Sequence, residues 1–201
     1  TEIYTLSLHD ALPISIFDNS YTLYYNTSSQ SGGTTKITKI EPEISGLTIE
    51  NKVRSANISS DKSYIFGAQY TYHRYIRGYL PRGKTNYKVR GSMPDPELFA
   101  AQFFTKKLIE NKIRVAKNPQ CLRILSDSAI SKSTKILFYT KYSPTLAEIV
   151  YQINKKSINL FAENLLVHIG KTLDSVDDTK SSTDAIVSFW GSKGMDTSGI
   201  S

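Results

Sequence analysis

Residues 86–111, NYKVRGSMPDPELFAAQFFTKKLIEN, decide how the chain divides into strands and helices. Up to Arg90 polar and apolar residues alternate, which is typical of a half-buried strand. From Asp95 onward the apolar residues recur every three or four positions, which is typical of a helix. Asp95, Pro96 and Glu97 supply a capping side chain, a proline at the first helical position and a carboxylate near the positive end of the dipole. The stretch predicts a β-rich region that gives way to helices.

The region before this helix contains short stretches rich in Tyr, Ile and Val, each bounded by Gly, Pro or Asp, and we expect them to be strands. The strand candidates are Tyr21–Tyr25, Ile37–Ile40, Leu47–Glu50, Tyr64–Ala68, Tyr72–Leu80 and Asn86–Arg90. Pro81 to Lys84 has the composition of a tight turn and predicts a hairpin between the last two. Short strands at this spacing predict a small antiparallel sheet or a sandwich.

The last third of the chain has helical periodicity, after a further strand candidate at residues 136–139. The helix signals are Ser143-Pro144 as a start, Asn159 and Gly170 as a start and a stop, and Ser181 to Thr183 and Gly194 as another such pair. Asn111 is the expected end of the helix that Asp95 opens. The predicted fold class is α+β, with a β-rich module and one helix over residues 16–120 and a helical domain over residues 121–201.

Composition limits the classes of protein and partner. At 39% hydrophobic and 21% charged residues, the chain has the composition of an ordinary globular protein, and it has no apolar run long enough to span a membrane. A net charge of +7 could favour a polyanionic partner. The 25 basic residues are spread along the chain, however, and the densest stretch, Arg74 to Arg90, alternates with aromatic residues. We expect a solvated sheet face and no nucleic-acid partner; a basic nucleic-acid-binding β module is the competing hypothesis.

Metal and cofactor sites are not expected. Cys121 is the single cysteine, which excludes an intramolecular disulfide and a site with several cysteine ligands. The three histidines, His9, His73 and His168, are far apart in the sequence.

Residues 1–15, TEIYTLSLHDALPIS, resemble the translation of a sequencing-library adapter joined in frame to a gene. We expect this segment to be non-native and to lie outside the fold, with the natural sequence starting near Ile16 and any export signal lost with what preceded it. The alternative is an ordinary amphipathic segment whose leucines pack in the fold.

Between two of the predicted helices lies Lys155-Lys156-Ser157-Ile158-Asn159. Taken alone, this short pattern has a structural explanation, in which Asn159 caps the following helix and Ser157 stabilises the turn. The lysines are then solvated residues at a helix end.

Longer blocks around this pattern resemble the D-alanyl-D-alanine carboxypeptidase/endopeptidase family, the class C low-molecular-mass penicillin-binding proteins. Tyr142 to Lys171 is similar to the family's Ser-x-Asn block, and Tyr64 to Ala101 to its β-rich inserted module and the next helix. Ser182 to Gly199 is similar to the segment ahead of an Asp-Gly-Ser-Gly loop. The resemblance covers most of residues 16–201 and implies an incomplete transpeptidase domain of the penicillin-binding-protein/β-lactamase type behind the inserted module.

The resemblance implies one catalytic and one substrate-binding residue in this chain. Members of the family use a Ser-x-x-Lys nucleophile with its base, a Ser-x-Asn motif and a Lys-Thr-Gly strand. On that pattern Ser157 is the hydroxyl that relays a proton, and Asn159 holds the peptide group of the substrate. Ser59 to Lys62 imitates the first motif in a polar turn, and Lys171 to Leu173 imitates the third without its glycine. We therefore expect the first and third motifs to lie outside the chain and the isolated chain to be inactive.

The function expected of the parent protein follows from the same resemblance. It is a serine-type D-Ala-D-Ala carboxypeptidase, a hydrolase of the periplasm or cell envelope that acts on peptidoglycan stem peptides through an acyl-enzyme and binds β-lactams. The alternative is a non-catalytic cell-wall-binding module on the same scaffold.

Overall fold

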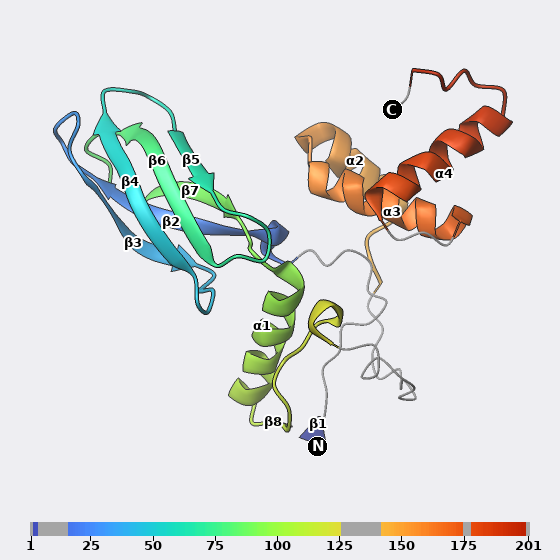
Figure 1. Ribbon diagram of the computed structural model, residues 1–201, viewed down its shortest axis with the longest axis horizontal. Helices are drawn as coiled ribbons and strands as arrows, with labels where there is room; N and C mark the ends of the chain where they lie inside the picture. The colour runs from blue at the N-terminus through green and yellow to red at the C-terminus, as the bar shows by residue number, and fades with distance from the viewer. Residues whose placement is uncertain (1, 4–15, 126–141, 175–177, 200–201) are drawn as a thin grey trace. The chain divides into compact units, whose positions relative to one another are not determined.

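A computed structural model describes residues 2–3, 16–125, 142–174 and 178–199 of the chain. The chain forms two units, of which the first ends at residue 125. The domain boundary at residues 120–121 stays a prediction. The first unit contains β1 (Glu2–Ile3), η1 (Phe17–Asn19), β2 (Ser20–Thr27), β3 (Thr35–Glu41), β4 (Thr48–Ala56), β5 (Lys62–Phe66), β6 (His73–Pro81), β7 (Tyr87–Ser92), α1 (Pro96–Glu110), β8 (Arg114–Val115) and η2 (Leu122–Ile124) (Figure 1). The second contains α2 (Leu146–Lys156), α3 (Asn159–Asp174) and α4 (Thr179–Ser192). This is the α+β fold that the sequence predicts.

Two three-stranded sheets form the body of the first unit (Figure 1). One has the order β3-β2-β7 with antiparallel pairs throughout, and Leu23 at its centre is paired with Ile40 and Val89. The other has the order β4-β6-β5, in which β4 runs parallel and β5 antiparallel to β6. The parallel pair departs from the predicted all-antiparallel arrangement, and it arises because the chain passes from β4 through β5 before it returns to the centre of the sheet as β6.

The core of this unit lies between the sheets. Tyr21, Leu23 and Tyr25 point inward from β2, as the period of two requires, and each is at most 1% exposed. Ile76 and Leu80 of β6 are completely buried in the same cluster. Residues from β4, β7, α1 and two loops complete it: Ile44, Val53, Val89, Met93 and Phe99.

The hairpin predicted between β6 and β7 is wrong. The turn at Pro81 to Lys84 is present, but it carries the chain from one sheet to the other, and β7 pairs with β2. Both edges of β6 are already occupied by β4 and β5, so β7 has no backbone groups to pair with there. The turn is fixed by hydrogen bonds to other loops: Arg82 N donates to the carbonyl of Ala56, and Gly83 N to that of Ser28.

Asp95 begins α1, as predicted. Its carboxylate accepts a hydrogen bond from the backbone N of Leu98 at 3.2 Å and also pairs with the guanidinium of Arg123 in η2. That guanidinium lies 4.2 Å from the centre of the Tyr70 ring. The side chain of Asp95 is completely buried, whereas that of Arg123 is about a third exposed. Asp95 thereby joins the start of α1 to η2, and Asn111 ends the helix as predicted.

In the second unit, two predicted helix starts and one predicted stop are corrected. Thr145 caps α2 in place of Ser143-Pro144, because Thr145 and Glu148 bond each other's backbone N–H reciprocally. Asp178 caps α4 in place of Ser181 to Thr183, and its carboxylate accepts from Ser181 N at 2.9 Å. Gly170 does not end α3, which runs on to Asp174. The stop predicted at Gly194 agrees with the end of α4 at Ser192.

The strand predicted at residues 136–139 lies outside the described residues, as does most of the adapter-like segment. Glu2–Ile3 pairs in parallel with Arg114–Val115, and whether residues 1–15 are non-native stays a prediction. Among the described helices, none combines the length and the apolar character that crossing a bilayer requires.

Candidate active site

The connection between α2 and α3 consists of Ser157 and Ile158 alone. Ser157 ends α2 in the left-handed conformation, with φ 51° and ψ 50°, a region that costs a residue other than glycine on the order of 1 kcal/mol. Its side chain is exposed, and Ser157 Oγ makes no hydrogen bond to any described residue. Backbone strain of this kind is concentrated at functional sites and turns.

Asn159 is the first residue of α3 and lies after the capping position. The carbonyl of Ile158 accepts the first hydrogen bonds of the helix, from Phe161 N at 3.1 Å and Ala162 N at 3.3 Å, which places Ile158 at the cap. The structural explanation in which Asn159 caps the helix is therefore wrong. The Asn159 amide is exposed and has no hydrogen-bond partner among the described residues, so both polar groups of the motif remain available for other partners.

The N-terminal end of α2, opposite to the end at Ser157, is capped by Thr145. Thr145 Oγ1 donates to the Glu148 carboxylate at 2.8 Å, and Thr145 N donates to the same carboxylate at 2.8 Å. These bonds to the ionised form hold the pKa of Glu148 below its ordinary value. The reciprocal cap satisfies backbone donors that the helix itself cannot satisfy.

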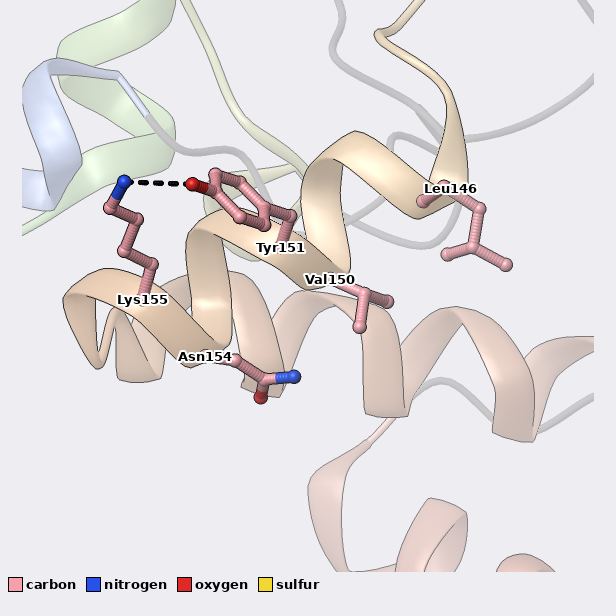
Figure 2. A pocket seen from close by; sticks show the side chains of 6 residues that line it. Leu146, Val150, Tyr151, Asn154 and Lys155 are labelled. Atoms are coloured by element: carbon pink, nitrogen blue, oxygen red, sulfur yellow. Dashed lines mark hydrogen bonds between the residues drawn. The ribbon is translucent and has the colours of Figure 1, made fainter.

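Lys155 is held on the surface of α2 one turn after Tyr151. Its Nζ donates to the Tyr151 hydroxyl at 2.7 Å and lies 5.1 Å from the ring centre, an arrangement visible in Figure 2. The sequence predicts Lys155 and Lys156 only as solvated residues at a helix end, although the i, i+4 spacing of Tyr151 and Lys155 is a signal for this contact. Both lysines are exposed.

An apolar hollow of about 800 Å³ runs along one face of α2, where Leu146, Val150 and Asn154 project at helical spacing (Figure 2). None of the α2 residues is buried, and Leu146 is 60% exposed. Ser157 and Asn159 are not among the lining residues.

The two imitations of family motifs lie in the settings the sequence predicts for them. Ser59 is exposed in the loop before β5, and Lys62 is the first residue of that strand, so the pair does not share a helix face. Lys171 and Leu173 lie in the last turns of α3 rather than on an edge strand.

One group of side chains in the first unit has the composition of a metal site. Asp95, Glu97 and Cys121 each offer a ligand atom, and the three atoms lie within 4.8 Å of one another. The Asp95 carboxylate is already paired with Arg123, which supplies positive charge where an ion would have to act. Burial raises the pKa of the Cys121 thiol, so the thiolate that a metal requires is disfavoured. The arrangement is explained by the ion pair.

Comparison with known proteins identifies the family. The model of the D-Ala-D-Ala carboxypeptidase 3 (S13) family matches residues 9–201, nearly the whole chain. The chain belongs to this S13 family. The resemblance found in the Ser-x-Asn block and the flanking blocks is thereby confirmed.

Solved structures agree at the level of fold. The S13 chain is similar to penicillin binding protein 4 from Haemophilus influenzae complexed with a β-lactam, at 15% identity and a TM-score of 0.61, over 100% of this chain and 46% of that one. It is also similar to a structure of the same protein described without a ligand, at 15% identity and a TM-score of 0.61, over 90% of this chain and 38% of that one. The S13 chain thus spans less than half the length of these structures. No curated protein matches it.

Proposed function

We propose that this S13 chain is the part of a serine-type D-Ala-D-Ala carboxypeptidase/endopeptidase that carries the Ser-x-Asn motif, with Ser157 as the proton relay and Asn159 as the substrate clamp. The observation that carries the proposal is the turn between α2 and α3. Ser157 and Asn159 are exposed there, two positions apart, and neither has a hydrogen bond to a described residue. Family membership supplies the reaction.

The reaction cleaves the peptide bond between two D-alanines of a peptidoglycan stem peptide. A serine of the parent protein attacks the carbonyl carbon, forms an ester and releases the terminal D-Ala as an amine, which must take up a proton. Water then hydrolyses the ester and regenerates the serine. A hydroxyl at Ser157 can accept a proton and pass it to the departing nitrogen, and the Asn159 amide can both donate to a carbonyl and accept from an N–H.

The nucleophilic serine and its base are proposed to lie in another part of the parent protein. Ser59 is an unsuitable substitute, because a serine hydroxyl needs a neighbouring base and Lys62 lies on a strand after an exposed loop. The 201-residue chain alone is therefore proposed to be inactive and to resist acylation. The parent protein is proposed to act in the periplasm or cell envelope, where its peptidoglycan substrate is found.

The experiment compares the chain with its complete parent protein, both incubated with a labelled penicillin and with a D-Ala-D-Ala peptide. We expect a stoichiometric adduct and release of D-Ala from the parent, and neither from the 201-residue chain by mass spectrometry. An adduct on any serine of the short chain would overturn the assignment of motifs. A complete parent that binds peptidoglycan but shows neither acylation nor hydrolysis would establish the non-catalytic cell-wall-binding module instead.

A further inference from the structure

A buried arginine in the first unit has no carboxylate partner. The side chain of Arg74 points inward from the middle of the β4-β6-β5 sheet, and the residue is 4% exposed. No carboxylate of a described residue lies within ion-pair distance of it. Buried arginines are almost always paired, because removing an uncompensated charge from water is costly. This one therefore needs an explanation.

Protein groups satisfy only one end of the guanidinium. Arg74 Nη1 donates to the carbonyl of Thr71 at 2.7 Å, to those of His73 and Ala68 at 3.2 and 3.3 Å, and to Thr71 Oγ1 at 3.2 Å. The other two nitrogens, Nη2 and Nε, donate to no described residue. An arginine has five N–H donors arranged as a planar fork, so an edge suited to a pair of oxygen atoms is left over.

A second buried polar group lies close to this arginine without a partner. The hydroxyl of Tyr21, which points inward from β2, makes no hydrogen bond to a described residue although Tyr21 is 1% exposed. Burial raises the pKa of Tyr21, while the charge of Arg74 and a polar contact with its side chain act in the opposite direction, so the hydroxyl and the guanidinium are close together. The contact falls short of the distance and angle of a full hydrogen bond. Buried hydroxyls without a partner are uncommon and costly.

A polar pocket of about 320 Å³ opens between the edge strands β5 and β7, and Tyr21 is not itself among the residues that line it. Arg74 lines it, and so does Gly91, which is paired with Tyr21 across β2 and β7. A side chain at Gly91 would place its Cβ 2.7 Å from the Tyr21 hydroxyl, so the glycine brings that hydroxyl to the pocket wall. Ser63 and Ser92, which each carry a hydroxyl group, also line this pocket.

The charges around the pocket favour an anion. Arg74 and Arg90 line the pocket with two positive charges and Asp61 with one negative charge. Because Arg90 is paired with Asp18, the positive charge left for an anion is that of the buried Arg74. The Asp61 carboxylate is occupied by the backbone N and the hydroxyl of Ser63, at 2.7 and 2.6 Å. Arg90 donates to Asp18 at 3.2 Å and to Ser20 Oγ at 2.6 Å, and its side chain is exposed. The side chain of Arg74 is buried.

We infer that the pocket between β5 and β7 is a binding site for a small oxyanion, a carboxylate or a phosphate group, held by the Arg74 guanidinium and the Tyr21 hydroxyl. A carboxylate or a phosphate group accepts two parallel hydrogen bonds from the free edge of a guanidinium, and it can accept a further one from a phenol. Occupation would pair the buried charge and satisfy both orphaned donors at once. The site belongs to the β-rich unit and does not depend on the chemistry proposed for Ser157.

The experiment titrates the 201-residue chain separately with inorganic phosphate and with acetate, using sodium chloride to hold the ionic strength constant. Binding is followed by calorimetry and by the thermal midpoint. We expect a saturable response to at least one probe and none to chloride, and the stronger probe shows whether the site takes a phosphate or a carboxylate group. Absence of a saturable response to both probes would overturn the inference.

Variants locate the site. Tyr21→Phe removes only the unpaired hydroxyl and should weaken binding about threefold to tenfold, the range for one neutral hydrogen bond. Arg74→Gln should weaken it more than about tenfold, because the bonds lost are charge-assisted. Arg54→Gln is the matched control, an exposed arginine of the same sheet that should leave binding unchanged. If Arg74→Gln fails to fold, Tyr21→Phe decides: affinity equal to that of the Arg54 control would refute the site.

Discussion

Gly170 of α3 and Ser182 of α4 lie so close together that a Cβ on the glycine would coincide with the serine side chain. Both residues are buried, together with Val167 and Ala185, and these small side chains allow the two helices to approach each other. The close approach explains why a glycine stands inside α3 instead of ending it.

Gly170→Ala should therefore destabilise the helical unit. The added methyl group has to displace Ser182, and overpacking of this kind typically costs about 1–3 kcal/mol. Gly191→Ala in α4 is the matched control, because its Cβ would meet nothing closer than Thr197 Oγ1 at 3.7 Å. That exchange should stabilise by about 0.5–1 kcal/mol through helix propensity. Denaturant unfolding monitored by circular dichroism measures both, and equal effects of the two variants would contradict the packing argument.

Removing the Ser182 hydroxyl should be neutral or slightly stabilising. Ser182 Oγ is buried and has no hydrogen-bond partner among the described residues, so Ser182→Ala deletes an unsatisfied group rather than a bond. A destabilisation of more than about 1 kcal/mol, the worth of a typical hydrogen bond, would show that the hydroxyl has a partner.

Asp95→Ala should destabilise the first unit more than the loss of an ordinary helix cap, which costs about 1 kcal/mol. The same carboxylate caps α1 and pairs with Arg123, so the change removes both interactions. Asp178→Ala is the comparison, since Asp178 caps α4 and is exposed. Thermal unfolding of the two variants measures the difference, and equal losses would mean that the Arg123 pair contributes nothing.

The buried tyrosines predict a loss of stability at alkaline pH. Burial raises the pKa of Tyr25 above its ordinary value of 10.0, and Tyr21 is shifted in the same direction. The folded state thus resists ionisation while the unfolded chain loses protons above about pH 10. These tyrosines should leave the free energy of unfolding unchanged between pH 7 and about pH 10 and should lower it above that pH.

Tyr25→Phe should flatten that decline. Because the Tyr25 hydroxyl has no hydrogen-bond partner among the described residues, the variant should be at least as stable as the unsubstituted chain at pH 7. Denaturant titrations from pH 7 to pH 11 test both statements. If the free energy of unfolding of the variant fell by the same amount at alkaline pH, groups other than Tyr25 would cause the fall. Tyr64→Phe is the control, because Tyr64 is exposed.

The parts of this fold set by local chemistry were predictable, and those set by competition between distant segments were not. Asp95, Asn111 and Gly194 act within a few residues of their own position, so their effects on α1 and α4 follow from the sequence. The partner of β7 depends on which strands already occupy β6, and no local pattern contains that information. Gly170 is similar: the sequence contains its helix-ending tendency but not the proximity of Ser182.

The candidate site divides in the same way. The long blocks around Ser157 led to the family, and the alternation of turn and helix signals placed Ser157 between α2 and α3 and Asn159 at the start of α3. The cap at Ile158 was not predictable, because the preference for asparagine at such positions points one residue too far along. The pocket at Arg74 had no signal in the sequence, since a basic residue in an alternating strand gives no indication that it points inward.

Deletion of residues 1–15 tests the nature of the adapter-like segment. A chain that begins at Ile16 should match the full chain in solubility and thermal midpoint if the segment is non-native. The pairing of Glu2–Ile3 with Arg114–Val115 is the interaction that the deletion removes. A decrease of several degrees in the midpoint would show that this strand pair stabilises the first unit and that the segment is part of the fold.

Substitutions at Ser157 and Asn159 in the complete parent enzyme test the proposed roles. Ser157→Ala should reduce turnover of a D-Ala-D-Ala peptide by at least about a hundredfold, the usual loss when a positioned proton relay is removed. Its thermal midpoint should stay nearly unchanged, because Ser157 Oγ has no hydrogen bond to a described residue. Asn159→Ala should also leave the midpoint nearly unchanged, since the cap lies at Ile158, but it should weaken substrate binding as well as turnover.

Ser143→Ala is the control for both variants, because the Ser143 hydroxyl is exposed and, among the described residues, donates to the carbonyl of Pro144 alone. It should change neither stability nor turnover. Steady-state kinetics and thermal unfolding of the three variants separate the outcomes. Near-normal turnover in Ser157→Ala would make Ser157 an ordinary turn residue. A loss of activity matched by an equal loss of stability in Asn159→Ala would assign that residue to the fold, because a substrate clamp changes KM and kcat while the folded population is unchanged.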